Sequence, residues 1–387
     1  MAGLWPLTGY YLVHFSSVGV TLPFLPAYFR SLHLSGTQIG VLLAMSPLLA
    51  LLAPPLWGHL ADRTGRPDRV LSAVALGACL GFAPVLWLQG FGPLVAAYVV
   101  YSFFASSITT VIDSLTLRRV EVAGGSYSRI RLFGSVGFVI SSTAFGVLVS
   151  QVDVRAVWVA LALMLSAFAC SLAIRTRTAP APAAHPLAGL RLLRERDVAL
   201  LLACTALHWI ACAPFHGSFA IHVTALGLPP RVVGLSAGLG VVAEIAVMFL
   251  YPRLFARVQP RHLISLSCAA SAVRWLCVSL VDRGAPLVAL QVIHGLTFGL
   301  FYIASVSYLA RRAPPHLRAS AQALYVAVTF GVGGLVGYTA GGAGYDALGG
   351  HRLFAAAAAL ELLPAALALL VRPPAPGVAA SVVASPP

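Results

Sequence analysis

The stretch GHLADRTGRPDR, residues 58–69, separates two long apolar runs at 37–57 and 70–89. Each run is long enough to cross a bilayer, because about 20 apolar residues span the hydrocarbon core as a helix. The stretch itself holds three arginines and two aspartates, which belong in water rather than in hydrocarbon. Gly58 and Gly65 allow a tight turn with close backbone approach. We therefore predict a short charged loop between two membrane helices.

The same loop is a candidate gating element. Asp62 can accept hydrogen bonds from a helix N-terminus or from an arginine of a neighbouring helix. Such a latch would hold one half of a helix bundle against the other in one state and release it in the next. The alternative is a generic basic loop that only sets orientation. The residues expected to act in gating are Gly58, Asp62, Arg63, Gly65 and Arg66.

The composition points to a membrane protein. The chain has 387 residues, of which 59% are hydrophobic and 9% are charged. An average soluble domain has roughly 25% charged residues, so an ordinary cytosolic enzyme is excluded. The net charge of +14 would suggest nucleic acid in a soluble protein, but in a membrane protein it concerns orientation, and we expect no nucleic-acid partner. The six cysteines stand singly in apolar stretches, so neither a disulfide framework nor a metal site is indicated. No cofactor is expected.

Apolar periodicity predicts twelve membrane helices, and thus an all-α membrane protein. Their expected bounds are 8–29, 37–57, 70–89, 93–117, 130–150, 156–174, 198–225, 232–251, 263–281, 285–309, 320–345 and 351–371. The loops on one side hold 19 arginines and those on the other side hold five. This asymmetry predicts that both termini are cytoplasmic, because basic residues are enriched on that side.

A polar stretch near the middle of the chain divides six predicted helices from six. We expect an N-terminal half at 1–174, a cytoplasmic linker at 175–197, a C-terminal half at 198–372 and a disordered tail at 373–387. Part of the linker, LAGLRLLRER, could form a short amphipathic helix, but a solvated linker is preferred. Equal halves favour a 6+6 duplication. An offset of 194 residues between the halves places His14 on His208.

Charged residues inside the predicted helices are candidate site residues, since charge in a membrane is costly unless it is paired or lines a wet cavity. In the first half, Asp113 faces arginines at the start of the next helix, where opposite charges can neutralise one another, although both could instead mark helix ends. In the second half the embedded charges are Glu244, Arg274, His294 and Glu361. A purely structural pair of Glu244 with Arg274 remains an alternative, and Glu361 is the weaker candidate.

One predicted helix combines aromatic and polar residues on a single face. At helical spacing, residues 291, 294, 298, 301 and 305 place Gln, His, Phe, Phe and Ser toward one neighbour. Such a stripe is usually core. Its polar tips also suit a partly apolar, partly hydrogen-bonding cavity, which makes His294 and Phe298 candidates for substrate contact.

Three of these motifs resemble the major facilitator superfamily. The loop at 58–69 resembles its signature loop between membrane helices, and RIRLFGSVGF at 129–138 looks like the helix-five motif of the lactose permease, nucleoside symporter and phenylpropionate permease branches. QVIHGLTFG at 291–299 is similar to helix ten of the phenylpropionate branch. Lactose permease has an acid where this chain has Thr297. The resemblance implies two six-helix halves that alternate access to a midplane site, with Asp113 and Arg131 in substrate recognition.

These observations together favour a secondary transporter of a small organic solute, either an aromatic carboxylate such as phenylpropionate or a sugar or nucleoside, driven by proton symport. A passive facilitator or a non-transporting sensor on the same fold is the alternative. An enzyme is not expected, because the sequence has no HExxH motif. We expect a monomer that crosses a bacterial inner membrane many times, with protons and a small molecule as partners.

The expected substrate-binding residues are Asp113, Arg131, His14, His208, Arg274, His294 and Phe298. The expected proton-coupling residues are Glu244, Asp113 and His294.

Overall fold

The computed structural model describes residues 4–176, 188–255, 257–314 and 317–372. All regular secondary structure in these ranges is helical, which confirms the prediction of an all-α protein for them. The tail expected at 373–387 and linker residues 177–187 lie outside the described residues.

The chain forms two compact units, which we describe separately. The first comprises Met1–Ala184, His216–Gly238 and Tyr338–Asp346, and the second comprises His185–Phe215, Leu239–Gly337 and Ala347–Pro387. Four of the five boundaries fall inside three long helices, α8 (Arg196–Ala225), α9 (Arg231–Leu254) and α14 (Gly333–Leu370). Contacts inside the first unit explain this. For example, Asp346 of α14 accepts hydrogen bonds of 2.7 and 2.8 Å from the backbone N–H groups of Gly36 and Thr37, at the start of α2.

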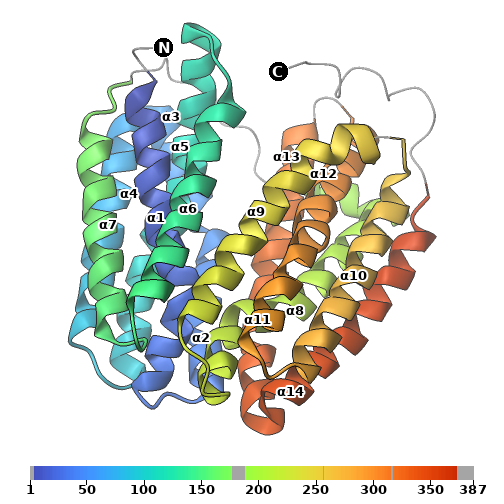
Figure 1. Ribbon diagram of the computed structural model, residues 1–387. Coiled ribbons are helices and arrows are strands. Elements are labelled where there is room, and N and C mark those ends of the chain that lie inside the picture. Colours follow the sequence, from blue (N-terminus) through green and yellow to red (C-terminus); the bar gives the residue numbers. More distant parts are fainter. Residues whose placement is uncertain (1–3, 177–187, 256, 315–316, 373–387) are drawn as a thin grey trace. The chain divides into compact units, whose positions relative to one another are not determined.

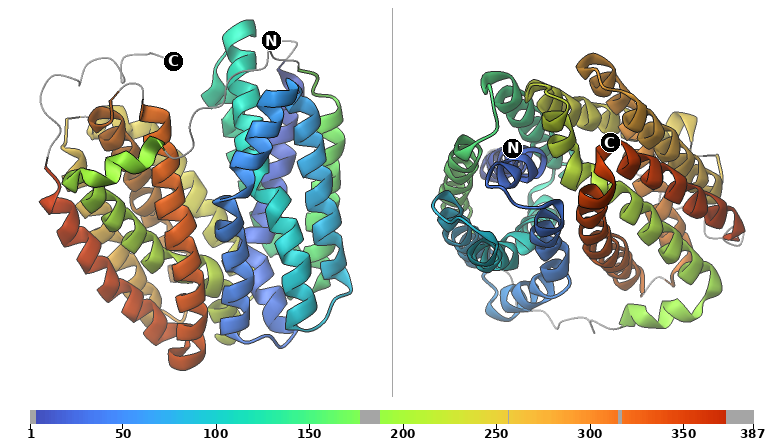
Figure 2. Two further views of the ribbon diagram at one scale, coloured as in Figure 1. Left: turned by 180° about the vertical axis from the view of Figure 1, so that it is seen from behind. Right: turned by 90° about the horizontal axis from the view of Figure 1, so that it is seen from below.

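The first unit is built mainly from the helices that come first in the chain (Figures 1 and 2). They are α1 (Trp5–Ser31), α2 (Gly36–Ala50), α3 (Ala53–Thr64), α4 (Pro67–Phe82), η1 (Ala83–Leu86), α5 (Phe91–Ala123), α6 (Tyr127–Leu148) and α7 (Val154–Leu172). In this unit α1 packs against α6 and α7, and α4 packs against α5 and α7. Small residues permit the close approach of α1 and α6, because a Cβ at Gly137 would collide with the backbone oxygen of Leu12.

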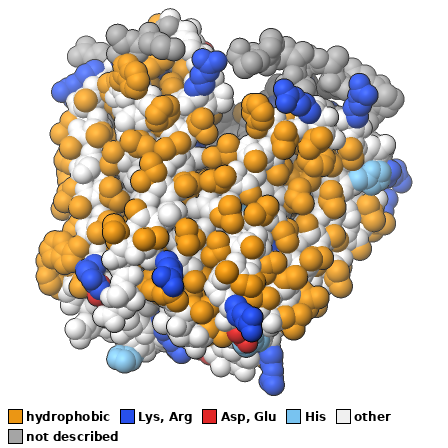
Figure 3. Space-filling model, in the orientation of Figure 1, with side chains coloured by type: hydrophobic (Ala, Val, Ile, Leu, Met, Phe, Trp, Pro, Cys, Tyr) orange, Lys and Arg blue, Asp and Glu red, His pale blue; other side chains and the backbone are white. Residues whose placement is uncertain are grey.

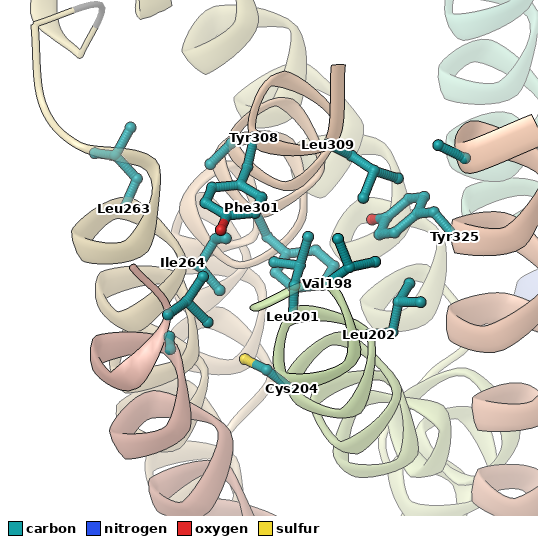
Figure 4. Close-up of a cluster of buried hydrophobic side chains, with 14 of the residues drawn as sticks. Val198, Leu201, Leu202, Cys204, Leu263, Ile264, Phe301, Tyr308, Leu309 and Tyr325 are labelled. Atoms are coloured by element: carbon teal, nitrogen blue, oxygen red, sulfur yellow. The ribbon is translucent and has the colours of Figure 1, made fainter. Parts of the chain in front are cut away.

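The second unit contains the remaining helices. Besides parts of α8, α9 and α14, they are η2 (Ala188–Arg194), α10 (Pro260–Leu280), α11 (Gly284–Ala289), η3 (Leu290–Ile293), η4 (Gly295–Leu300), α12 (Phe301–Arg312), α13 (Arg318–Val326) and η6 (Ala327–Val332). Their core includes Leu201, Ile264, Phe301 and Tyr325 (Figure 4). Linker residues 188–194 form η2, and Leu192 within it is buried in this core. Leu190, Arg191, Leu193 and Arg194 of the same stretch are exposed, so only Leu192 anchors it, and the solvated linker stays a prediction.

Singly or joined end to end, these helices form segments that are long and apolar enough to cross a membrane. Eleven such segments are present in the described chain, and ten of them coincide one to one with the first ten predicted spans. The last segment, Arg318–Leu370, has 53 residues and covers the final two predictions together. It is interrupted at Gly349, whose φ of 72° and ψ of 174° are not helical. Hydrophobic side chains are spread over the face in Figure 3, and most of its arginines lie near the upper and lower ends, as a surface between lipid and water requires.

Candidate functional site

A cluster of charged and aromatic side chains lies in the first unit where α1, α5 and α6 meet. The hydroxyl of Tyr11 donates a hydrogen bond of 2.5 Å to the carboxylate of Asp113. The guanidinium carbon of Arg131 lies 4.0 Å from the ring centroid of Phe15 and 5.7 Å from that of Tyr11. Two predicted site residues, Asp113 and Arg131, are thus brought together through Tyr11. Cation–π contact of this kind holds a guanidinium without consuming its N–H donors.

His14 belongs to the same cluster. It is buried, it stacks on Tyr10 with centroids 5.8 Å apart, and its ring meets Phe15 edge to face at 5.1 Å. Sequence reasoning missed Phe15. Its position four residues after Tyr11 and next to His14 was the available signal, because residues i and i+4 share a helix face.

The second unit has its own cluster, centred on Arg274 of α10. This side chain is 2% exposed, and it donates hydrogen bonds of 3.1 Å to both Nδ1 of His294 and the hydroxyl oxygen of Thr297. A third hydrogen bond runs from its other terminal nitrogen to the side-chain oxygen of Gln291. The guanidinium also lies against the rings of Phe215 and Trp275, at 4.5 and 4.4 Å. Its Nε–H has no acceptor among the described residues.

The contact with Arg274 fixes the tautomer of His294. A guanidinium has donors and no acceptor, so Nδ1 of His294 must accept and cannot carry a hydrogen while this contact lasts. The hydrogen of the neutral ring therefore sits on Nε2, which is 3.9 Å from the Glu244 carboxylate. Arg274 and Glu244 are thus connected through His294.

A π-helical turn shapes this part of the site. η4 covers Gly295–Leu300 and adds a residue to the turn, as π-bulges at functional sites often do. His294 stacks on Phe298 with centroids 5.8 Å apart, and Phe298 stacks on Tyr302 at 6.1 Å. Phe301 is instead fully buried against His208 at 4.1 Å. The predicted single face with Phe298 and Phe301 together is therefore wrong, because the wider turn shifts the register after residue 295.

His208 is fully buried and contacts a residue that the sequence made a weak candidate. Its Nδ1 is 2.8 Å from Oε2 of Glu361, which is also fully buried. Its Nε2 is 3.1 Å from the backbone oxygen of Thr297. Together with Cys268, these two residues have ligating atoms within 4.8 Å of one another. The direct hydrogen bond occupies the nitrogen and the carboxylate oxygen, so we assign the cluster no metal.

The loop at 58–69 is mostly helix. α3 continues through Gly58 to Thr64, so the expected turn at Gly58 is wrong, whereas Gly65 ends the helix with a φ of +62°. Asp62 pairs with Arg118 of α5 at 2.9 Å, inside the first unit. Arg66 contacts Asp68 at 3.2 Å, and Arg63 is exposed. A gating role stays a prediction, which the rate of conformational exchange in Asp62→Asn would test.

An apolar cavity of about 450 Å³ also lies in the first unit. Val20 of α1, Phe145 of α6 and Trp158 of α7 are among its lining residues. The predicted site residues do not line it, so the candidate site is defined by the two clusters.

Comparison with known proteins agrees with this architecture. The MFS_1-like family matches residues 4–356, so the chain belongs to this family of the major facilitator superfamily and is a multi-pass membrane protein. It is similar to the maltose permease of Geobacillus stearothermophilus, with 32% identity over 84% of this chain and 83% of that protein. It is also similar to a probable 3-phenylpropionic acid transporter of Escherichia coli, with 30% identity over 84% of this chain and 87% of that one.

The fold has a solved counterpart. The crystal structure of the D323A mutant of the nucleoside transporter NupG superposes with a TM-score of 0.88, over 95% of this chain and 99% of that one, at 16% identity. The two sequence relatives are a permease and a probable transporter, which confirms the prediction that the chain is a membrane transporter and not an enzyme.

Proposed function

We propose that the chain is a proton symporter that carries a small aromatic carboxylate by alternating access. The observation that carries this proposal is Arg274, a buried guanidinium between two aromatic faces whose Nε–H has no acceptor among the described residues. An unused donor on a buried cation favours an anionic ligand, and aromatic surroundings favour an aromatic body. Similarity to a probable 3-phenylpropionic acid transporter gives independent support.

A sugar is the second candidate. It is favoured by the 32% identity to a maltose permease. A neutral sugar would use hydroxyl donors and acceptors such as Tyr302, but it would offer the Nε–H of Arg274 a weaker acceptor than a carboxylate does.

Counterflow in vesicles distinguishes the two candidates. Purified protein in lipid vesicles is loaded with 3-phenylpropionate, maltose or a nucleoside, and entry of the same labelled compound is followed. We expect exchange of 3-phenylpropionate alone. If maltose exchanges and 3-phenylpropionate does not, the proposed substrate is a sugar and not a carboxylate. If none of the three compounds exchanges, the proposal is wrong.

The proposal extends to the topology of the chain in the membrane. We propose twelve crossings with both termini cytoplasmic, because each side of the break at Gly349 has enough residues for one crossing of about 20. We further propose a monomer in a bacterial inner membrane. Protease access to a C-terminal tag in inside-out vesicles tests the orientation, and light scattering in detergent tests the oligomeric state.

A further inference from the structure

The buried pair of His208 on α8 and Glu361 on α14 has no part in the proposed substrate contacts. Both side chains are fully buried in the second unit. Nδ1 of His208 lies 2.8 Å from Oε2 of Glu361, and Nε2 lies 3.1 Å from the backbone oxygen of Thr297.

These contacts fix the number of hydrogens on the pair. A carbonyl oxygen only accepts, so Nε2 of His208 carries a hydrogen. The contact between Nδ1 and Oε2 needs a second hydrogen between the two atoms, bonded either to the imidazole nitrogen or to the carboxyl oxygen. In either case the pair is neutral overall and holds one shared proton. Without it, two lone pairs would face each other in a buried environment, and the side chains would have to separate.

The surroundings supply donors to the other carboxylate oxygen of Glu361 and connect the pair to the candidate site. Trp275 donates its indole N–H to Oε1 of Glu361 at 3.4 Å, and the Cys212 thiol donates to the same oxygen at 3.5 Å. The Trp275 ring and the Thr297 hydroxyl both contact Arg274. The titratable and charged groups that face the pair are Cys204 and Cys212 of α8 and Cys268 and Arg274 of α10.

We propose that the His208–Glu361 pair is a proton-binding site, distinct from Glu244, that retains its proton at neutral pH and releases it only when α8 and α14 move apart. A role of this proton in transport would rest on the proposed function. Its binding does not, and can therefore be tested without a substrate.

Thermal unfolding of the full chain in detergent, at a series of pH values, tests the site. Above about pH 7, an unfolded chain has an ionised glutamate and a neutral histidine, so the folded pair holds one proton more than the unfolded one. Stability must then fall as pH rises, by about tenfold in the unfolding equilibrium constant per pH unit. Below about pH 6.5 the unfolded histidine also holds a proton, and the difference disappears.

The decisive comparison is between wild type and Glu361→Gln. The amide can donate to Nδ1 while Nε2–H still donates to Thr297, so the pair stays hydrogen-bonded without a titratable proton. We expect the wild-type midpoint to fall relative to this variant from about pH 7 to about pH 9. Glu244→Gln, which alters the other embedded acid of this unit, should keep the wild-type slope. The thiols are common to all variants and cancel in the difference.

Parallel profiles for wild type and Glu361→Gln would overturn the proposal. If Glu361→Gln does not fold, the double variant His208→Gln/Glu361→Gln provides an uncharged pair with the same expectation. A wild-type midpoint that does not fall over this range would overturn the proposal without any variant.

Discussion

At the residue scale, Arg274 is held by geometry that only a guanidinium offers. It reaches the three acceptors His294, Thr297 and Gln291 with two terminal nitrogens. Its planar face also lies against Trp275. A lysine would bring the same charge, but on a single ammonium nitrogen. That nitrogen could neither reach the three acceptors at once nor stack a planar face on Trp275.

We therefore expect Arg274→Ala to abolish transport, and Arg274→Lys to recover less than about a tenth of it. Counterflow in vesicles measures both, and size-exclusion profiles check that folded protein remains. Arg253→Ala is the matched control, because that exposed arginine also contacts an aromatic ring, Phe249, at 5.7 Å and should be dispensable. Normal uptake by Arg274→Ala would remove this residue from the site.

The sequence identified candidate site residues, but it did not identify the residues that contact them. Arg274 and His294 stand out because charge and polarity are rare in apolar helices. Glu361 was undervalued, since a single acid in an apolar run says nothing of the helix that packs against it. Its contact with His208 joins positions 153 residues apart, which helical periodicity cannot supply.

At the element scale, the spans were predictable and their internal irregularities were not. Hydropathy located the membrane helices because bilayer thickness fixes their length. The π-turn at Gly295–Leu300 departs from the regular helical period on which the predicted face was based, and Phe301 lies off that face. Similarly, α3 continues through Gly58, since one glycine costs only about 1 kcal/mol in a helix and does not by itself end one.

Glycine packing between α1 and α6 gives a prediction at this scale. A Cβ at Gly137 would collide with the backbone oxygen of Leu12 and lie 2.9 Å from the Ser16 hydroxyl oxygen. Backbone cannot move aside cheaply, so Gly137→Ala should cost about 1–3 kcal/mol and lower the thermal midpoint in detergent. Gly9→Ala in α1 is the control, because nothing lies within 4 Å of its new Cβ. Equal midpoints for the two variants would contradict close α1–α6 packing.

At the scale of the whole molecule, the buried charges of the second unit can be balanced. If His208 and Glu361 share one proton, that pair is neutral. The charges that remain in the Arg274 cluster of this unit are Arg274 and Glu244, which His294 connects. An anionic substrate at Arg274 would leave one negative charge in excess, and a proton on Glu244 would restore the balance. Burial makes such compensation favourable, and it gives one proton for one anion.

This balance predicts how Glu244→Gln behaves. His294 cannot accept the proton on Nδ1 while Arg274 donates there, so under the proposed symport we expect Glu244 to gain and lose it. The variant mimics the protonated state permanently. It should keep counterflow of 3-phenylpropionate, which needs no net proton movement, and lose accumulation driven by an imposed pH gradient.

Vesicles with and without that gradient provide the measurement. Glu195→Gln is the control, since this acid pairs with Arg312 at 3.1 Å, outside the Arg274 cluster, and should leave both activities unchanged. Accumulation by Glu244→Gln equal to wild type would assign coupling to another group, with Asp113 next because it lies beside Arg131 in the cluster of the first unit. If wild type itself accumulates nothing under any proton gradient, the embedded acids serve only to balance Arg274, and the chain is a passive carrier.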